Sequence, residues 1–119
     1  MSILEKLNKA INEKDGNAVS ELIHDDYKRY SHLQGGYTDS GKQGMIDAIN
    51  QGKLNPDKHR ILFENDEVGF DHSIMTYEDG NKEALMCYWK FKDGKVIELE
   101  TGATTVSYTH LTLPTKRIV

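Results

Sequence analysis

The side chains best placed by type to move a proton near neutral pH are Tyr30 and His32, which lie close together in the chain, and His72. A histidine can exchange a proton with a tyrosine hydroxyl in this pH range. Because His72 stands between Phe70 and Ile74, burial on an apolar face would favour its neutral, basic form. We therefore predict a catalytic set of His72 with Tyr30 or His32. The alternative is that His72 is a hydrogen-bonded core residue or faces solvent.

Other ionisable groups fit structural roles better. Asp25 and Asp26 are adjacent in a turn, where side chains point apart and carboxylates usually accept backbone N–H groups. Cys87 has no cation beside it in the sequence to activate its thiol, so an inert, buried thiol is expected. Glu98 and Glu100 share one strand face and should be solvated. The five histidines form no H-x-H or H-E-x-x-H pattern, so neither a metal site nor another cofactor is expected.

The composition limits the class of protein. The 119 residues carry a formal net charge of −4 and are 37% apolar and 29% charged, which fits one globular domain. An acidic chain without a basic stripe argues against nucleic acid as a partner. No apolar run approaches the ~20 residues that cross a bilayer, and the N-terminus lacks the apolar stretch of a secretion signal. A lone cysteine fits the cytoplasm, so we expect a cytoplasmic domain that binds a small molecule or a protein.

Three helices are predicted in the first half of the chain. Ser2 and Glu5 form a capping-box pattern, and apolar residues then recur at helical spacing until Asp15-Gly16, where a left-handed glycine is expected to end the helix. Asn17 is the expected cap of a short second helix that ends before the acidic turn at 24–26. Ser40 is the expected cap of a third helix, which Gly52 closes.

The second half of the chain is predicted to be strands. The apolar period changes from 3.6 to 2 at Lys58. After a short strand at 27–32, four longer strands are expected at about 59–64, 67–77, 82–92 and 95–101, with a four-residue link at 78–81. Asp79-Gly80 and Asp93-Gly94 are strong hairpin signals. The last three strands should therefore form an antiparallel meander.

Alternation along these strands predicts which side chains face inward. The inward set is expected to be Phe70, His72 and Ile74 on one strand, followed by Leu85, Cys87, Trp89, Phe91, Ile97, Leu99 and Thr101 on the next two. Five of these are the predicted substrate-binding residues: Phe70, Ile74, Cys87, Trp89 and Leu99. A one-residue change in register would exchange the two faces of a strand.

Three segments in this order resemble one superfamily. The stretch Ile11–Ala18 is similar to an N-x-x-D-x-x-A helix junction, Leu22–Tyr27 to an F-x-D-D helix end, and Tyr88–Glu98 to an F-x-x-x-D-G-K-I hairpin. Together they resemble the nuclear transport factor 2-like superfamily, which includes SnoaL-like polyketide cyclases and ketosteroid isomerases. The resemblance covers residues 3 to about 103. It implies an α+β, cone-shaped barrel in which three N-terminal helices pack on a curved, mostly antiparallel sheet around an apolar pocket.

The resemblance also allows one reaction to be tested by position. The catalytic tyrosine, aspartate base and second acid of the ketosteroid isomerases fall here at about Leu7, Ser31 and Cys87. None of the three carries the required group, so that reaction is not expected.

What the resemblance leaves open is the choice between two functions. One is a cofactor-free proton-transfer enzyme of the cyclase, isomerase or lyase type that acts on a small apolar or amphipathic molecule. The other is a non-catalytic ligand-binding or dimerisation module, because this fold hosts many activities. A homodimer is expected through an outer sheet face carrying Met75, Tyr77, Met86 and Tyr88.

The end of the chain differs from the rest. Residues 106–119 contain no acid, whereas residues 1–105 carry all 19. The stretch Val106–Thr115 resembles the translation of a transposon-end adapter used in sequencing libraries, and the adapter's continuation would encode Val119 and a stop. We therefore expect a domain at 1–105 and an adapter-derived, dispensable tail at 106–119, so that the natural C-terminus is a different one.

Overall fold

Helix α1 (Ile3–Asn12) begins at the capping box that the sequence predicts. The Ser2 hydroxyl accepts the Glu5 backbone N–H at 3.2 Å, and the Glu5 carboxylate accepts the Ser2 N–H at 2.9 Å, so two of the free N–H groups at the helix start are satisfied. Its buried face is formed by Leu4, Leu7, Ala10 and Ile11. The spacing of these four residues puts them on one side of the helix, which packs on the sheet.

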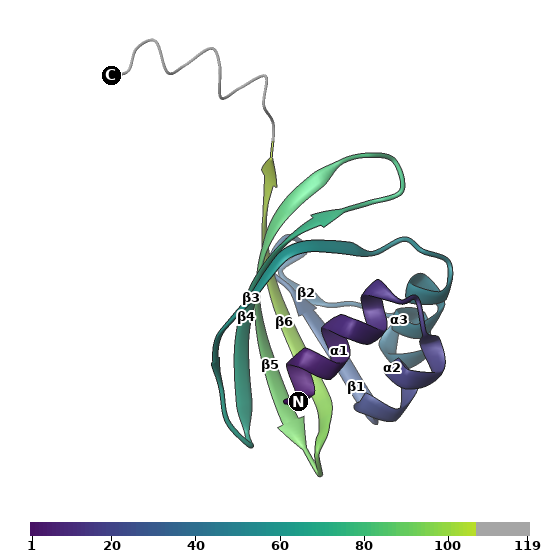
Figure 1. Ribbon diagram of the computed structural model, residues 1–119. Coiled ribbons are helices and arrows are strands. Elements are labelled where there is room, and N and C mark those ends of the chain that lie inside the picture. The colour runs from purple at the N-terminus through teal and green to yellow at the C-terminus, as the bar shows by residue number, and fades with distance from the viewer. Residues whose placement is uncertain (107–119) are drawn as a thin grey trace.

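Residues 1–106 are described by the computed structural model. The three helices lie on one side of a curved six-stranded sheet (Figure 1). After α1 the elements are α2 (Gly16–Leu22), β1 (Ile23–Ser31), β2 (Gly36–Tyr37), α3 (Gly41–Asn50), β3 (Asn55–Glu64), β4 (Val68–Thr76), β5 (Lys82–Lys92) and β6 (Lys95–Val106).

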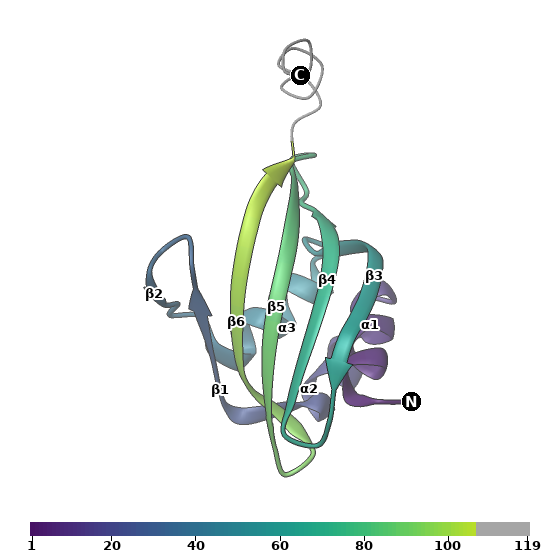
Figure 2. The ribbon, with the colours of Figure 1, turned by 90° about the vertical axis from the view of Figure 1, so that its left-hand side faces the viewer.

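The sheet has the strand order β2-β1-β6-β5-β4-β3, which Figure 2 shows face-on. Strand β1 runs parallel to β6, and every other neighbouring pair is antiparallel. The α+β architecture and the antiparallel meander are as expected. The sheet does not close into a barrel, because β2 and β3 remain its two edges; it is an open, curved sheet.

The hairpin between β5 and β6 follows its sequence signal. Asp93 and Gly94 have φ values of 55° and 75°, the left-handed pair that a two-residue turn between twisted strands requires. The turn pairs Phe91 with Val96, and a bulge at Ile97 then shifts the register by one residue, so that Trp89 pairs with Leu99 and Cys87 with Thr101. Directly paired residues lie on the same face, and these four are buried on the concave side, as predicted.

Several boundaries differ from the prediction. The left-handed residue after α1 is Lys14 (φ 55°) rather than Gly16, and Asp15, not Asn17, caps α2 by accepting the Ala18 N–H at 3.1 Å. Gly16 is needed for space, because a Cβ there would lie 2.3 Å from the Asn50 side chain.

Strands β1, β3 and β6 are also longer than expected, since β6 continues to Val106, and the two-residue strand β2 was not expected. Strand β1 starts at Ile23, which is fully buried and pairs with Val96, and β3 starts at Asn55.

The predicted tail lies almost wholly outside the described residues, which end at Val106. Val106 itself is the last residue of β6 and pairs with Lys82. None of the helices within residues 1–106 is long and apolar enough to cross a membrane.

Candidate functional site

A cavity of about 420 Å³ lies between the concave face of the sheet and helices α1 and α3. Most of its lining is apolar, with Leu4, Leu7, Met45, Met75 and Leu85 among the contributors. A cavity of this size and character suits a small organic molecule. Four of its lining residues have side chains that are commonly charged near neutral pH, namely Arg29, His59, Asp71 and Glu83.

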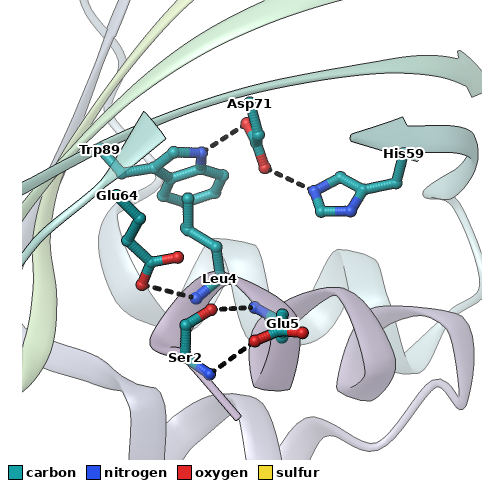
Figure 3. Close-up of polar contacts among 7 residues, drawn as sticks. All are labelled: Ser2, Leu4, Glu5, His59, Glu64, Asp71 and Trp89. Carbon is teal, nitrogen blue, oxygen red and sulfur yellow. Dashed lines mark hydrogen bonds and ion pairs between the residues drawn. The ribbon is translucent and has the colours of Figure 1, made fainter. Parts of the chain in front are cut away.

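Two of these groups form a hydrogen-bonded unit with the indole of Trp89. The His59 Nε2 lies 2.8 Å from one Asp71 carboxylate oxygen, and the Trp89 N–H donates to the other at 2.7 Å (Figure 3). Asp71 is 7% exposed. An ionised carboxylate can only accept, so the Asp71 contact assigns the His59 proton to Nε2. The lone pair of neutral His59 is then on Nδ1, where it can accept a proton.

A β-bulge brings His59 to the concave side. Asp57 pairs with Ile74 and Arg60 with His72, so that two residues, Lys58 and His59, stand opposite one residue of β4. Lys58 has a left-handed φ of 53°, and its N–H donates to the Asp57 side chain at 2.9 Å. The strand changes phase at this bulge: His59 shares the concave face with Ile61, which pairs with Asp71, whereas alternation counted from Pro56 would place it on the outer face.

Two tyrosines, Tyr27 and Tyr77, also line the cavity. The Tyr77 hydroxyl donates to Glu83 at 2.7 Å. The pKa of Tyr77 is raised above its ordinary value of 10.0, mainly by burial and in addition by the hydrogen bond to Glu83. The pKa of Tyr27 is also raised above 10.0, and burial is the main cause. Burial also raises the pKa of the Cys87 thiol, with the Asp71 carboxylate adding to the effect. These phenols and this thiol are therefore proton donors rather than bases at neutral pH.

Arg29 reaches the same cavity from β1. It pairs with Leu99 in the parallel ladder, and residues paired with Leu99 share its concave face. The guanidinium Nε is buried and has no hydrogen-bond partner within residues 1–106. None of the ion pairs in this part of the chain includes Arg29.

The structure divides the predicted substrate-binding residues into two groups. Cys87, Trp89 and Leu99 line the cavity. Phe70 and Ile74 do not, because they lie on the outer, convex face of β4, and the expectation that their side of the strand faces inward is wrong. The concave side of β4 carries Gly69, Asp71, Ser73 and Met75 instead.

The length of one turn explains this exchange of faces. A four-residue link at 78–81 would pair Tyr77 with Lys82 and place His72 opposite Cys87. The link in the structure has five residues, so Thr76 pairs with Lys82 and Asp71 with Cys87. One added residue reverses every side chain of the strand. Counting the register from Cys87 leads to Asp71 only with the five-residue link and to His72 with the four-residue one.

The predicted catalytic residues are also on the outer face. His72 pairs with Met86 and Arg60, and strands β5 and β6 separate it from Tyr30 on β1. Tyr30 and His32 do lie together, with ring centroids 6.3 Å apart. The His32 Nε2 lies 2.6 Å from the Glu100 carboxylate. The expected combination of His72 with either of them is therefore not brought together by the fold.

Helix α1 explains the small and polar residues inside β4. A Cβ on Gly69 would lie 2.7 Å from a methyl carbon of Leu4, so the helix leaves no room for a side chain there. Asp71 is tolerated two residues further on because His59 and Trp89 satisfy both of its oxygens. The alternation of apolar residues that suggested Phe70 and Ile74 for the core belongs instead to a partly exposed outer surface.

Comparison with solved structures shows the nuclear transport factor 2-like fold. An NTF2-like protein from Cytophaga hutchinsonii is 13% identical with a TM-score of 0.72, over 86% of this chain and 87% of that one. A second NTF2-like protein from the same organism is 25% identical, with a TM-score of 0.58 over 86% and 93%. A Kribbella flavida protein provisionally assigned as a ketosteroid isomerase is 14% identical, with a TM-score of 0.68 over 88% and 77%. No protein-family model matches the chain, and curated proteins give no significant match.

Proposed function

We propose that this chain is a proton-transfer enzyme that acts on a small apolar or amphipathic molecule in the cavity, with His59 as the base. The observation that carries the proposal is the His59–Asp71–Trp89 unit, an oriented imidazole at the wall of a largely apolar cavity. The reaction needs no cofactor, because the groups that move the proton are side chains of the chain itself.

The hydrogen bonds define the role of each residue. His59 Nδ1 removes a proton from a carbon next to a carbonyl group, and the electron pair left behind moves onto the carbonyl oxygen. Asp71, 2.8 Å from Nε2, stabilises the imidazolium that forms and keeps the ring oriented. The Trp89 N–H holds the Asp71 carboxylate in place. Returning the proton to a different carbon gives an isomerase, whereas loss of a leaving group gives a lyase.

The base proposed here differs from that of the ketosteroid isomerases. The three positions to which the family's catalytic groups map are Leu7, Ser31 and Cys87, and all three line the cavity. They supply no carboxylate and no phenol. The catalytic group in this chain therefore comes from the bulge in β3, and His72, Tyr30 and His32 play no part in the proposed reaction.

Deuterium exchange of simple carbon acids tests the proposal. Cyclohexanone and β-tetralone would be incubated with the protein in deuterium oxide, and loss of the α-proton signal followed by NMR. We expect the wild-type chain to accelerate exchange and His59→Gln to lower the rate by about 10²–10⁴-fold, the usual contribution of a general base. The matched control is His72→Gln, which removes an imidazole from the outer face and should keep the full rate.

A non-catalytic ligand-binding module is the second candidate. The observation that favours it is that His59 and Asp71 satisfy each other, as structural residues also do. Binding to the cavity combined with equal exchange rates for the wild-type, His59→Gln and His72→Gln proteins would overturn the enzyme proposal and leave this alternative.

A further inference from the structure

The unpartnered guanidinium of Arg29 distinguishes this cavity from a purely apolar one. Arg29 lies on β1 beside Leu99 of β6 and lines the cavity. Its Nε is buried without a hydrogen-bond partner in the described part of the chain. A buried donor on a charged group that has no acceptor is costly, so a ligand that supplies the acceptor would gain affinity there.

The carboxylates already in the cavity are not available to Arg29. Asp71 is bonded by His59 and Trp89 at 2.8 and 2.7 Å, and Glu83 is bonded by Tyr77 at 2.7 Å. Within residues 1–106 neither of them forms an ion pair with Arg29. Each acid has its own hydrogen-bond donor, whereas within residues 1–106 the guanidinium of Arg29 has no counter-ion and its Nε has no hydrogen-bond partner.

The size and lining of the cavity define the class of anion. The described residues that line it include one arginine, no lysine and the two carboxylates Asp71 and Glu83. One cation suits a single negative charge, and the two carboxylates would repel a phosphate dianion more strongly. A guanidinium can donate two parallel hydrogen bonds to the two oxygens of one carboxylate. The rest of the lining is mostly apolar, with Leu7, Met45 and Leu85 among it, which suits a compact hydrocarbon body.

We infer that the cavity binds a compact apolar carboxylic acid as its carboxylate, with Arg29 as the residue that recognises the charge. The inference rests on the proposed function for the assignment of this ligand as a substrate. Arg29 on β1 and His59 on β3 come from strands that β6, β5 and β4 separate, so they approach the cavity from different sides. A ligand anchored at Arg29 would therefore present to His59 a carbon remote from its carboxylate.

Binding of a matched pair of rigid probes tests the inference. Adamantane carboxylate and adamantane carboxamide have the same shape and differ in charge, and neither absorbs where tryptophan is excited. Trp89 is the only tryptophan of the chain and lines the cavity, so its fluorescence reports occupancy. We expect wild-type protein to bind the carboxylate about 10- to 100-fold more tightly than the amide, as charge-assisted bonds allow.

Two arginine variants assign the preference. Arg29→Met should lose the preference for the carboxylate while still binding the amide, and Arg29→Lys should keep part of it, because it keeps the charge without the planar fork. Arg60→Met is the matched control: Arg60 is an exposed arginine on β3 paired with His72, and its loss should leave both affinities unchanged. Circular dichroism of each variant shows whether it is folded.

Three outcomes would overturn the inference: equal affinity of the wild-type chain for the two probes, no binding of either probe, or a carboxylate preference that survives in folded Arg29→Met. If Arg29→Met does not fold, the wild-type comparison and Arg29→Lys decide. His59→Gln separates the two proposals, because it should lower the rate of deuterium exchange by about 10²–10⁴-fold yet retain the carboxylate preference. If His59→Gln keeps the preference for the carboxylate probe and also keeps the wild-type rate of deuterium exchange, only the catalytic proposal is contradicted.

Discussion

The Trp89 indole N–H donates to Asp71 across two neighbouring strands at 2.7 Å, and both side chains are buried. Asp71 pairs directly with Cys87, and Trp89 with Gly69, so the bond is a diagonal contact on the concave face. The position where Gly69 lacks a side chain is taken up by Leu4 and Phe91. The same carboxylate then holds His59, which links the packing under helix α1 to the orientation of the proposed base (Figure 3).

Asp71→Asn should keep the shape of this unit and remove its function. The amide oxygen can still accept from Trp89, but its NH₂ group would then face His59 and shift the imidazole proton to Nδ1, the atom proposed as the base. We expect activity to fall about as far as in His59→Gln, by about 10²–10⁴-fold, with a stability loss of about 1–3 kcal/mol.

Deuterium exchange and urea unfolding would measure the two effects. Ser73→Ala is the control, since Ser73 is also buried on the concave face of β4 and lies outside the His59–Asp71–Trp89 unit. Full activity in a folded Asp71→Asn protein would remove the carboxylate from the mechanism.

Gly69→Ala should destabilise the fold through helix α1. The added methyl carbon would lie 2.7 Å from a Leu4 methyl carbon and 3.2 Å from the Phe91 ring, and overpacking of this kind costs about 1–3 kcal/mol. Gly36→Ala is the control, because no atom lies within 4 Å of a Cβ there and its φ is not left-handed. Urea unfolding measures both, and the double variant Gly69→Ala with Leu4→Ala should cost less than the sum of the two single changes.

The outer sheet face supports a prediction of a homodimer with a corrected set of residues. Met75 is buried and Tyr77 lines the cavity, so neither can belong to that face. The exposed apolar residues there are Phe63, Phe70 and Met86, and the rings of Phe70 and Tyr88 lie 5.3 Å apart. We expect a particle of twice the 13.5 kDa chain mass at micromolar concentration, because exposed apolar patches usually mark contact surfaces.

Met86→Glu should convert the homodimer to the monomer, because a two-fold interface would place the new charge against the apolar patch of the second copy. Sedimentation velocity measures the change in mass. The control is Leu33→Glu, which places the same charge at an exposed leucine outside the β3–β5 face. A wild-type protein that sediments only as the monomer would contradict the prediction.

Local signals in the sequence were sufficient for the three helices, for five of the six strands and for their order; the two-residue strand β2 was not predicted. The capping box at Ser2 and the Asp93-Gly94 turn are made by neighbouring residues, so they can be recognised without the fold. The concave face of β5 was predicted correctly because Cys87 and Trp89 alternate with polar residues. The four long strands follow from the same alternation.

The candidate site depends on features that no short window of sequence contains. One extra residue in the link at 77–81 exchanged the faces of β4, and the bulge at Lys58 turned His59 inward. Arg29 reaches the cavity because β1 runs parallel to β6, strands that are far apart in the chain. Such long-range pairings are decided by tertiary packing, which single-sequence patterns do not report.

Tyr27→Phe should make stability less sensitive to alkaline pH. Burial raises the pKa of the Tyr27 hydroxyl above its ordinary value of 10.0 in the folded protein. At a pH between the pKa of this hydroxyl in the unfolded chain and its pKa in the folded chain, the unfolded chain has lost the proton and the native chain retains it. The free energy of unfolding therefore falls as pH rises above about 10. Each such group contributes at most about 1.4 kcal/mol per pH unit. Phenylalanine keeps the ring and removes the titration, so urea unfolding from pH 8 to 11 should show a smaller decline of the free energy of unfolding with pH. The control is Tyr37→Phe, at an exposed position on β2, which should leave that decline unchanged. An equal decline in wild type and Tyr27→Phe would show that the Tyr27 hydroxyl ionises as readily in the fold as in the unfolded chain.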